Sequence, residues 1–159
     1  MSPFDTTTSI ASGVTETGPI AEAIRTRSNI FEMTQAAEDA VLRPKEFGAF
    51  PHDFRAALAA RIAAHAGDAN LAAQYANCTS GMADLSDPSH NSAKDHKILI
   101  AFVDRTSNAT KDISADDISL LQSSGVSDAD IVRLCELVAF VAYQVRVAAG
   151  LRLLQGNKA

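Results

Sequence analysis

Apolar residues recur at three- and four-residue steps over positions 127–155, near the end of the chain. The recurring positions are Ile131, Leu134, Cys135, Val138, Ala142, Val145, Ala149 and Leu153. Residues with this spacing share one face of an α-helix. Ser127 followed by Asp130 is typical of a helix N-cap, and the acidic first turn suits the helix dipole. The pattern therefore predicts one long helix over 127–155, around which the rest of the chain is organised.

The opposite face of this predicted helix is mixed. It begins polar with Arg133 and Glu136 and ends apolar with Val147, Leu151 and Leu154. A helix that is apolar on two sides has to be covered on two sides, so we expect the chain's own core on one side and a second subunit on the other. We expect no membrane span, because charged and polar residues interrupt the apolar run.

Shorter helical patterns fill the remainder of the chain, and no alternating strand pattern is present. They predict helices over 20–27, 28–42, 51–66, 69–78, 93–106 and 115–123, with a polar loop over 79–92. Ser114 and Asp117 form a capping box before the last of these. Residues 1–17 are rich in Ser, Thr and Gly, which predicts a flexible arm without regular structure. We expect an all-α protein of about six to eight helices, with a single domain over 18–157.

Length, net charge, and the numbers and spacing of cysteines and histidines narrow the class of protein. The chain has 159 residues, a formal net charge of −5 and no basic cluster, which argues against nucleic-acid binding. Its two cysteines are far apart, and its N-terminus has neither a basic nor an apolar leader segment. These features favour a reduced, cytoplasmic protein. The four histidines have no metal-ligand spacing, so we expect neither a metal nor a cofactor.

Three linked segments carry a resemblance to a known family. They are A-F-V-D-R-T-S-N-A-T-K-D-I-S-A-D-D-I-S-L-L, then G-V-S-D-A-D-I-V-R-L-C-E-L-V-A-F, then Q-V-R-V-A-A-G-L-R-L-L. Together with F-R-A-A-L-A-A-R-I-A-A-H-A-G, they resemble the AhpD-like, or carboxymuconolactone decarboxylase-like, family over residues 28–155. The nearest pattern is the peroxidase-related "CMD domain protein" subgroup. The resemblance implies an all-helical fold, a dimer, trimer or hexamer, and possibly a sibling alkylhydroperoxidase-domain partner.

The chain departs from this family at the redox centre. Active relatives carry a Glu, a C-x-x-C and a following His, and these positions fall at Ala56, at Asp68 and Leu71, and at Gln74. Thiol peroxidase chemistry needs an activated thiolate and a second thiol within disulfide reach. Neither is present at these positions, so we expect no AhpD-type peroxidase activity.

Several polar residues are candidates for a site in the residual family pocket. Arg61 and His65 lie on an apolar face and need partners, and other possible lining residues are Gln74, Tyr75, Tyr143 and Gln144. The alternative for Arg61 is a structural ion pair, and for His65 a place near the helix end without a further role.

Arg146 and the cysteines have competing interpretations as well. We expect Arg146 to form a buried ion pair with Asp104, with Glu46 and Asp84 as other possible partners and anion binding as the alternative role. Cys78 is either a displaced redox residue or a small half-buried side chain. Cys135 belongs to the apolar stripe, which predicts a buried position.

Three functions remain open from the sequence. The first is an oligomeric protein that binds a small molecule or a protein partner without redox chemistry. The second is an enzyme that uses His65 for acid–base chemistry, as in a decarboxylase. The third is a single-cysteine peroxidase-related protein that uses Cys78.

Overall fold

The computed structural model describes residues 1–79, 81–90 and 96–156, and in these residues the secondary structure is helical throughout, with no strand. The prediction of an all-α protein is confirmed. The α-helices of the described residues are α1 (Thr7–Ser12), α2 (Ala21–Thr26), α3 (Ser28–Leu42), α4 (His52–His65), α5 (Ala69–Ala76), α6 (Ala83–Ser86), α7 (Lys97–Asn108), α8 (Ala115–Ser123) and α9 (Asp128–Leu154). Two 3₁₀ turns, η1 (Pro3–Asp5) and η3 (Thr110–Asp112), complete them.

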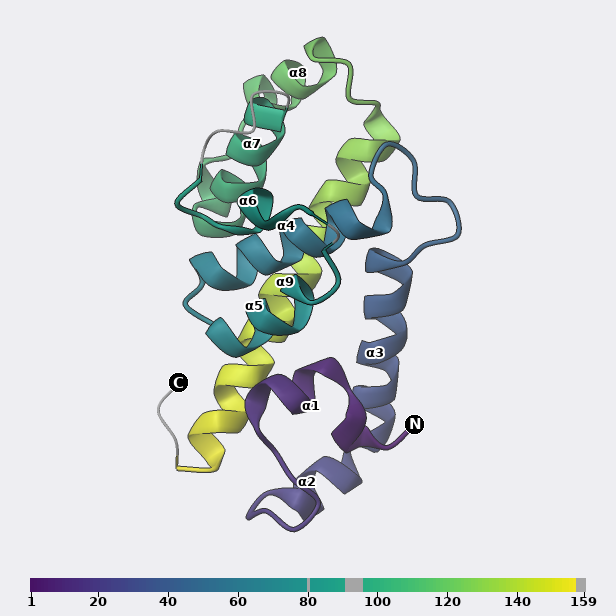
Figure 1. Ribbon diagram of the computed structural model, residues 1–159, viewed down its shortest axis with the longest axis vertical. Coiled ribbons are helices and arrows are strands. Elements are labelled where there is room, and N and C mark those ends of the chain that lie inside the picture. The colour runs from purple at the N-terminus through teal and green to yellow at the C-terminus, as the bar shows by residue number, and fades with distance from the viewer. Residues whose placement is uncertain (80, 91–95, 157–159) are drawn as a thin grey trace.

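Helix α9 runs through the length of the molecule and contacts α1, α3, α4, α7 and α8 (Figure 1). Its start follows the sequence prediction, because the Ser127 side chain accepts a hydrogen bond from the Asp130 backbone N–H at 3.2 Å. The core therefore forms around α9, with α4 crossing it and α3 lying along its other side (Figure 1).

The buried face of α9 is rotated relative to the predicted stripe. Ile131, Leu134 and Val138 are buried as expected, but Cys135 is exposed and Leu153 is 60% exposed. Leu137, Val141, Gln144, Ala148 and Leu151 complete the buried face instead. The sequence pattern misplaced the face because apolar residues surround this helix almost completely.

Exposed apolar residues follow the outer side of α9. Val132, Tyr143 and Leu154 are 55%, 39% and 68% exposed, and they are spaced at eleven-residue steps, which is about three helical turns. By length and composition alone, α9 is apolar enough to cross a membrane, and 33% of its most apolar stretch is buried inside the molecule. A core helix of a water-soluble protein satisfies the same criteria, so this property does not distinguish the two cases.

Helix α4 packs closely because small residues fill its faces. Ala57, Ala59 and Ala63 have no exposed surface, and α4 makes its most extensive contacts with α5 and α9. Alanine has the highest helix propensity and lets neighbouring backbones approach. Arg55 is also buried on α4, where its guanidinium donates to the carbonyl oxygens of Val41, Phe47 and Phe50. It thereby fixes the loop between α3 and α4.

The prediction of an N-terminal arm without regular structure is wrong. Residues 3–5 form η1 and residues 7–12 form α1, and Thr6 caps α1 by accepting from the Ser9 N–H. Thr8, Ser9 and Ala11 are each no more than 1% exposed. Polar composition misled the sequence interpretation, since these hydroxyl groups are satisfied by hydrogen bonds inside the protein rather than by water.

Two further segments differ from the sequence prediction. The expected loop over 79–92 contains the short helix α6. The helix expected over 93–106 is described from Lys97 and extends to Asn108, while residues 93–95 lie outside the described part of the chain. The expected domain end at residue 157 lies outside it as well. The remaining helices begin and end within two residues of their expected positions.

Candidate functional site

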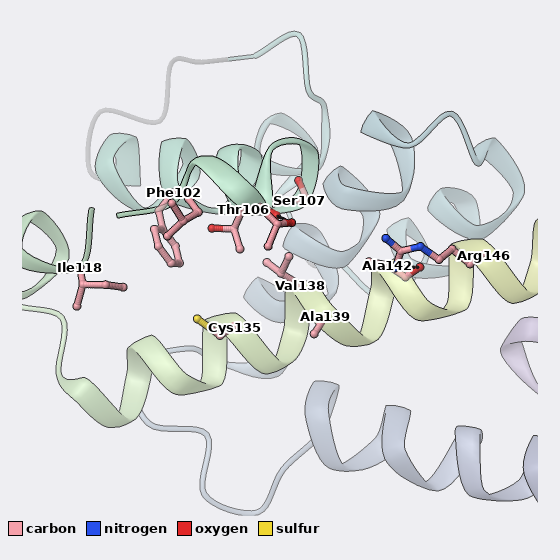
Figure 2. Close-up of a pocket in the computed structure, with 11 residues that line it drawn as sticks. Phe102, Thr106, Ser107, Ile118, Cys135, Val138, Ala139, Ala142 and Arg146 are labelled. Carbon is pink, nitrogen blue, oxygen red and sulfur yellow. Dashed lines mark hydrogen bonds between the residues drawn. The ribbon is translucent and has the colours of Figure 1, made fainter. Parts of the chain in front are cut away.

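A groove lies between α7 and α9 (Figure 2), and residues of η3 and α8 and of the segment between them also line it. Its volume is about 540 Å³, which is within the range of small-molecule sites. Its apolar wall consists of Phe102, Ile113, Ile118, Val138, Ala139 and Ala142. Its other lining residues are Thr106, Ser107, Thr110, Cys135 and Arg146. Of these residues, Cys135, Val138 and Ala142 were expected on the apolar stripe of α9, and only Cys135 and Arg146 were discussed for their chemistry.

Arg146 is exposed, so the predicted buried ion pair with Asp104 is wrong. Its guanidinium Nη1 donates to the carbonyl oxygen of Ala142, one turn earlier on the same helix, at 3.2 Å. Within the described residues, it forms no ion pair. Rotation of the buried face of α9 away from Arg146 explains the difference.

Both cysteines are exposed and free, and neither is part of a disulfide. Cys78 follows α5, and its sulfur lies 4.0 Å from the Gln74 carbonyl oxygen. Cys135 lies in the groove, where burial, and then the neighbouring Glu136 carboxylate, raise the pKa of its thiol. A raised pKa reduces the thiolate fraction at neutral pH and slows oxidation. The prediction of a buried Cys135 is wrong.

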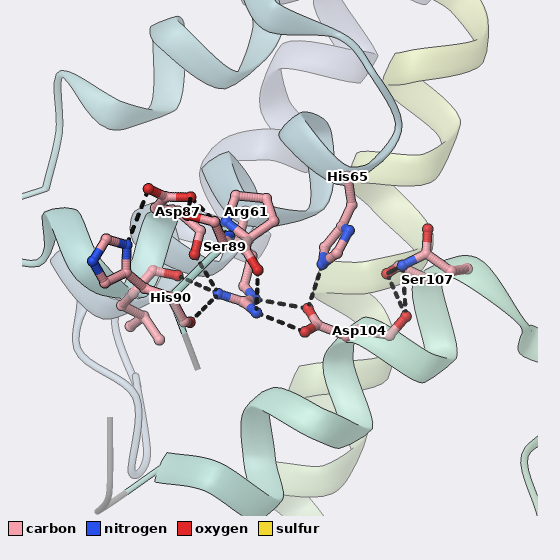
Figure 3. Close-up of polar contacts among 10 residues, drawn as sticks. Arg61, His65, Asp87, Ser89, His90, Asp104 and Ser107 are labelled. Atoms are coloured by element: carbon pink, nitrogen blue, oxygen red, sulfur yellow. Dashed lines mark hydrogen bonds and ion pairs between the residues drawn. The ribbon is translucent and has the colours of Figure 1, made fainter. Parts of the chain in front are cut away.

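Arg61 lies at the centre of a polar cluster between α4, α7 and the segment of residues 85–90 (Figure 3). Its side chain is wholly buried in the middle of α4, and it makes a bidentate ion pair with Asp104 of α7. The distances are 2.7 Å from Nε to Oδ1 and 2.7 Å from Nη2 to Oδ2. The structural interpretation of Arg61 is confirmed, and Asp104 is its partner.

Backbone oxygens of residues 85–90, at the end of α6 and just after it, accept hydrogen bonds from the other donors of Arg61. Nη1 donates to the carbonyls of Asp87 at 2.7 Å and His90 at 3.1 Å, with Leu85 at 3.4 Å, and Nη2 donates to Pro88 at 3.4 Å. A buried guanidinium is tolerated only when its charge and its N–H groups are matched in this way. Arg61 therefore anchors residues 85–90 against the core.

His65 lies one turn after Arg61 on α4 and points toward the same carboxylate (Figure 3). Its Nε2 is 3.3 Å from Asp104 Oδ1, and its side chain is 29% exposed. Because Arg61 binds both oxygens of Asp104, its positive charge neutralises the carboxylate that His65 contacts. This arrangement restrains the imidazole but leaves the carboxylate a weak orienting group for proton transfer.

Tyr75 and Gln144 meet in a second polar cluster, which joins four helices. The Tyr75 hydroxyl donates to Gln144 Oε1, and Gln144 Nε2 donates to Glu38 at 2.7 Å and to Thr8 at 3.2 Å. Glu38 also accepts from Thr7 Oγ1 at 2.8 Å. Burial raises the pKa of Tyr75 above its ordinary value, and the Glu38 charge adds to the shift. Sequence reasoning missed Thr8, which lies in the segment predicted to be a flexible arm, and Glu38, a polar residue of the helix predicted over 28–42.

The six pocket candidates therefore do not converge on one cavity. Arg61 and His65 belong to one cluster, and Tyr75 and Gln144 to another. Tyr143 is half exposed, and its hydroxyl lies 3.0 Å from Thr34 Oγ1. Gln74 is half buried on α5.

The positions that correspond to the redox motif of the resembled family lie in the core or stabilise helices that pack around it. Ala56 is 5% exposed and Leu71 has no exposed surface. Asp68 caps α5 by accepting from the Leu71 N–H at 3.0 Å, and it forms an ion pair with Arg152 at 2.7 Å. A hollow of about 320 Å³ lies between α4, α5 and α6, but alanines dominate its lining, and neither His65 nor Gln74 contributes to it.

No group of three His, Cys, Asp or Glu side chains that could hold a metal ion occurs within residues 1–79, 81–90 and 96–156. Comparison of the chain with protein-family models, with curated proteins and with solved structures finds no match.

We predict that Asp104→Ala lowers the free energy of unfolding by roughly 3–5 kcal/mol, because it leaves the buried Arg61 charge without its carboxylate. Urea denaturation measures this loss. The control is Arg105→Ala, one residue along α7. This change removes the ion pair between Arg105 and Asp117, in which the arginine side chain is 48% exposed. Such pairs contribute about 0–1 kcal/mol. Equal losses in the two variants would contradict the role assigned to Asp104.

We also predict a specific alkaline instability. The raised pKa of Tyr75 means that the unfolded chain loses this proton near pH 10 while the folded protein retains it. The contribution of Tyr75 to stability is thus fully present below about pH 10 and declines above it, by up to about 1.4 kcal/mol per pH unit. The urea midpoint of the wild type should decline between neutral and alkaline pH. This decline should be smaller in Tyr75→Phe and as large as in the wild type in Tyr143→Phe. A decline unchanged by Tyr75→Phe would refute this explanation.

Proposed function

We propose that the protein is an AhpD-like, carboxymuconolactone decarboxylase-like family member that has lost its redox centre and acts as an oligomeric binding protein. The all-helical fold is compatible with that family. One observation carries the proposal: the residues that occupy the positions of the redox motif stabilise the fold. Asp68 caps a helix and pairs with Arg152, while Leu71 fills the core.

The cysteines outside the motif support the absence of thiol chemistry. Cys78 is exposed, and within the described residues its sulfur has one polar contact, a backbone oxygen. Activation of a thiol requires a nearby cation, base or helix N-terminus, and Cys78 instead follows the C-terminal end of α5. Cys135 has a raised pKa and lies on a different helix. This arrangement disfavours the single-cysteine peroxidase alternative.

The outer side of α9 supports assembly. Val132, Tyr143 and Leu154 form an exposed apolar stripe along the longest helix. Exposed apolar stripes of this kind are typical of protein–protein contacts, and a second copy of the same chain is the simplest partner. A sibling alkylhydroperoxidase-domain protein would be the alternative partner that the family resemblance suggests.

Acid–base chemistry at His65 is the second candidate function. Its approach to Asp104 at 3.3 Å favours this alternative, since a carboxylate can orient a catalytic imidazole. It ranks below the binding function because Arg61 neutralises the carboxylate and because the groove is lined by residues other than His65. A turnover that His65→Gln abolishes without unfolding the protein would reverse this ranking.

We predict peroxide turnover at background level when the wild type is supplied with a dithiol reductant. The physical reason is the absence of two thiols within disulfide reach, for which Cα atoms lie about 4.4–6.8 Å apart. Cys78→Ser and Cys135→Ser serve as controls and should match the wild type. Turnover in the wild type that disappears in either variant would identify a displaced redox cysteine and refute the proposal.

We predict a stable homo-oligomer at micromolar concentration, measured by light scattering. Leu154→Glu should weaken the assembly, because it places a charge on the exposed stripe of α9. The matched control is Leu120→Glu, which changes a leucine that is 53% exposed on α8. A wild-type monomer with an intact helical spectrum, or equal effects of the two variants, would contradict the proposed interface.

A further inference from the structure

The groove between α7 and α9 has two chemically different ends (Figure 2). Ile118 and Phe102 lie toward one end, Ser107 lies near the middle, and Arg146 lies at the other end (Figure 2). Eleven residues of α9 separate Cys135 from Arg146, so the groove follows the helix for about 16 Å at a rise of about 1.5 Å per residue. A ligand that fills it is elongated, with an apolar body and a polar head.

The polar end carries a positive charge without a counter-ion. The guanidinium of Arg146 makes one hydrogen bond, to a carbonyl of its own helix, and no ion pair within the described residues. No Asp or Glu lines the groove, and the nearby Asp104 is bound by Arg61. The planar donor set of an arginine matches a carboxylate in bidentate geometry. The head group that this end selects is therefore anionic.

We propose that this groove is a binding site for an amphipathic carboxylate with an extended aliphatic chain. The chain lies against Phe102, Ile118 and Val138, and the carboxylate lies on Arg146. This inference deepens the proposed binding function and rests on it. A free fatty acid is the simplest ligand of this chemistry, because the groove volume is of small-molecule size.

Calorimetric titration with dodecanoate tests the proposal, with dodecanol and dodecyltrimethylammonium as uncharged and cationic analogues. We expect the wild type to prefer dodecanoate. Arg146→Gln should weaken dodecanoate binding roughly 10- to 100-fold, the loss expected when a charged hydrogen-bond donor is removed. Binding of dodecanol should change little. Arg105→Gln is the matched control, because Arg105 lies on the neighbouring helix α7 outside the groove.

Alkylation of the two cysteines locates the bound molecule. Cys135 lines the groove, and Cys78 lies outside it. Dodecanoate should slow the alkylation of Cys135 by iodoacetamide in Cys78→Ser protein. It should leave the alkylation of Cys78 unchanged in Cys135→Ser protein.

Absence of dodecanoate binding, equal binding by Arg146→Gln, or equal protection of both cysteines would overturn the proposed site. A change of oligomeric state in Arg146→Gln without any ligand effect would assign the groove to a subunit contact instead. In each of these cases, background peroxide turnover would leave the proposed loss of redox function standing. The two proposals therefore fail by different measurements.

Discussion

The placement of α7 depends on a guanidinium that water does not reach. Arg61 has no exposed surface, and its charge requires Asp104 of α7 on one side and the carbonyls of residues 85–90 on the other. Burying a charge without such partners is too costly for a folded protein to tolerate. Because α7 supplies one wall of the groove, the geometry of the candidate site follows from this ion pair. The groove and the anchor are thus parts of one arrangement, although they lie on different faces of α7.

A second buried polar cluster fixes the N-terminal segment. Gln144 bonds to Tyr75, Glu38 and Thr8, and it thereby connects α9 with α5, α3 and α1. Glu38 also accepts from Thr7, so the first helix has polar as well as apolar contacts with the core. Networks of this kind specify one arrangement of the helices, since any other arrangement leaves a buried group unpaired. Together, the two clusters fix the positions of helices that apolar packing alone would leave adjustable.

Local signals predicted the helices well, whereas the partners of buried polar residues needed the folded structure. Ser127 and Ser114 mark helix starts because capping depends on residues three positions away. The partner of Asp104 could not be chosen in the same way, because Arg61 and Arg146 are both distant in sequence. The face of α9 was misjudged for a related reason: apolar residues on all sides leave its rotation to tertiary packing. The groove, which requires α7, α8 and α9 in place, had no signature in the sequence.

The anchoring of residues 85–90 depends on main-chain oxygens rather than on side chains. Arg61 donates to the carbonyls of Leu85, Asp87, Pro88 and His90, and every amino acid has such a carbonyl. Substitutions of the polar side chains in this segment would therefore preserve the anchor, provided that the backbone path is kept. An insertion or deletion would not, because it would shift the carbonyls out of register with a side chain fixed in the core. This segment can thus vary in composition while remaining constrained in length.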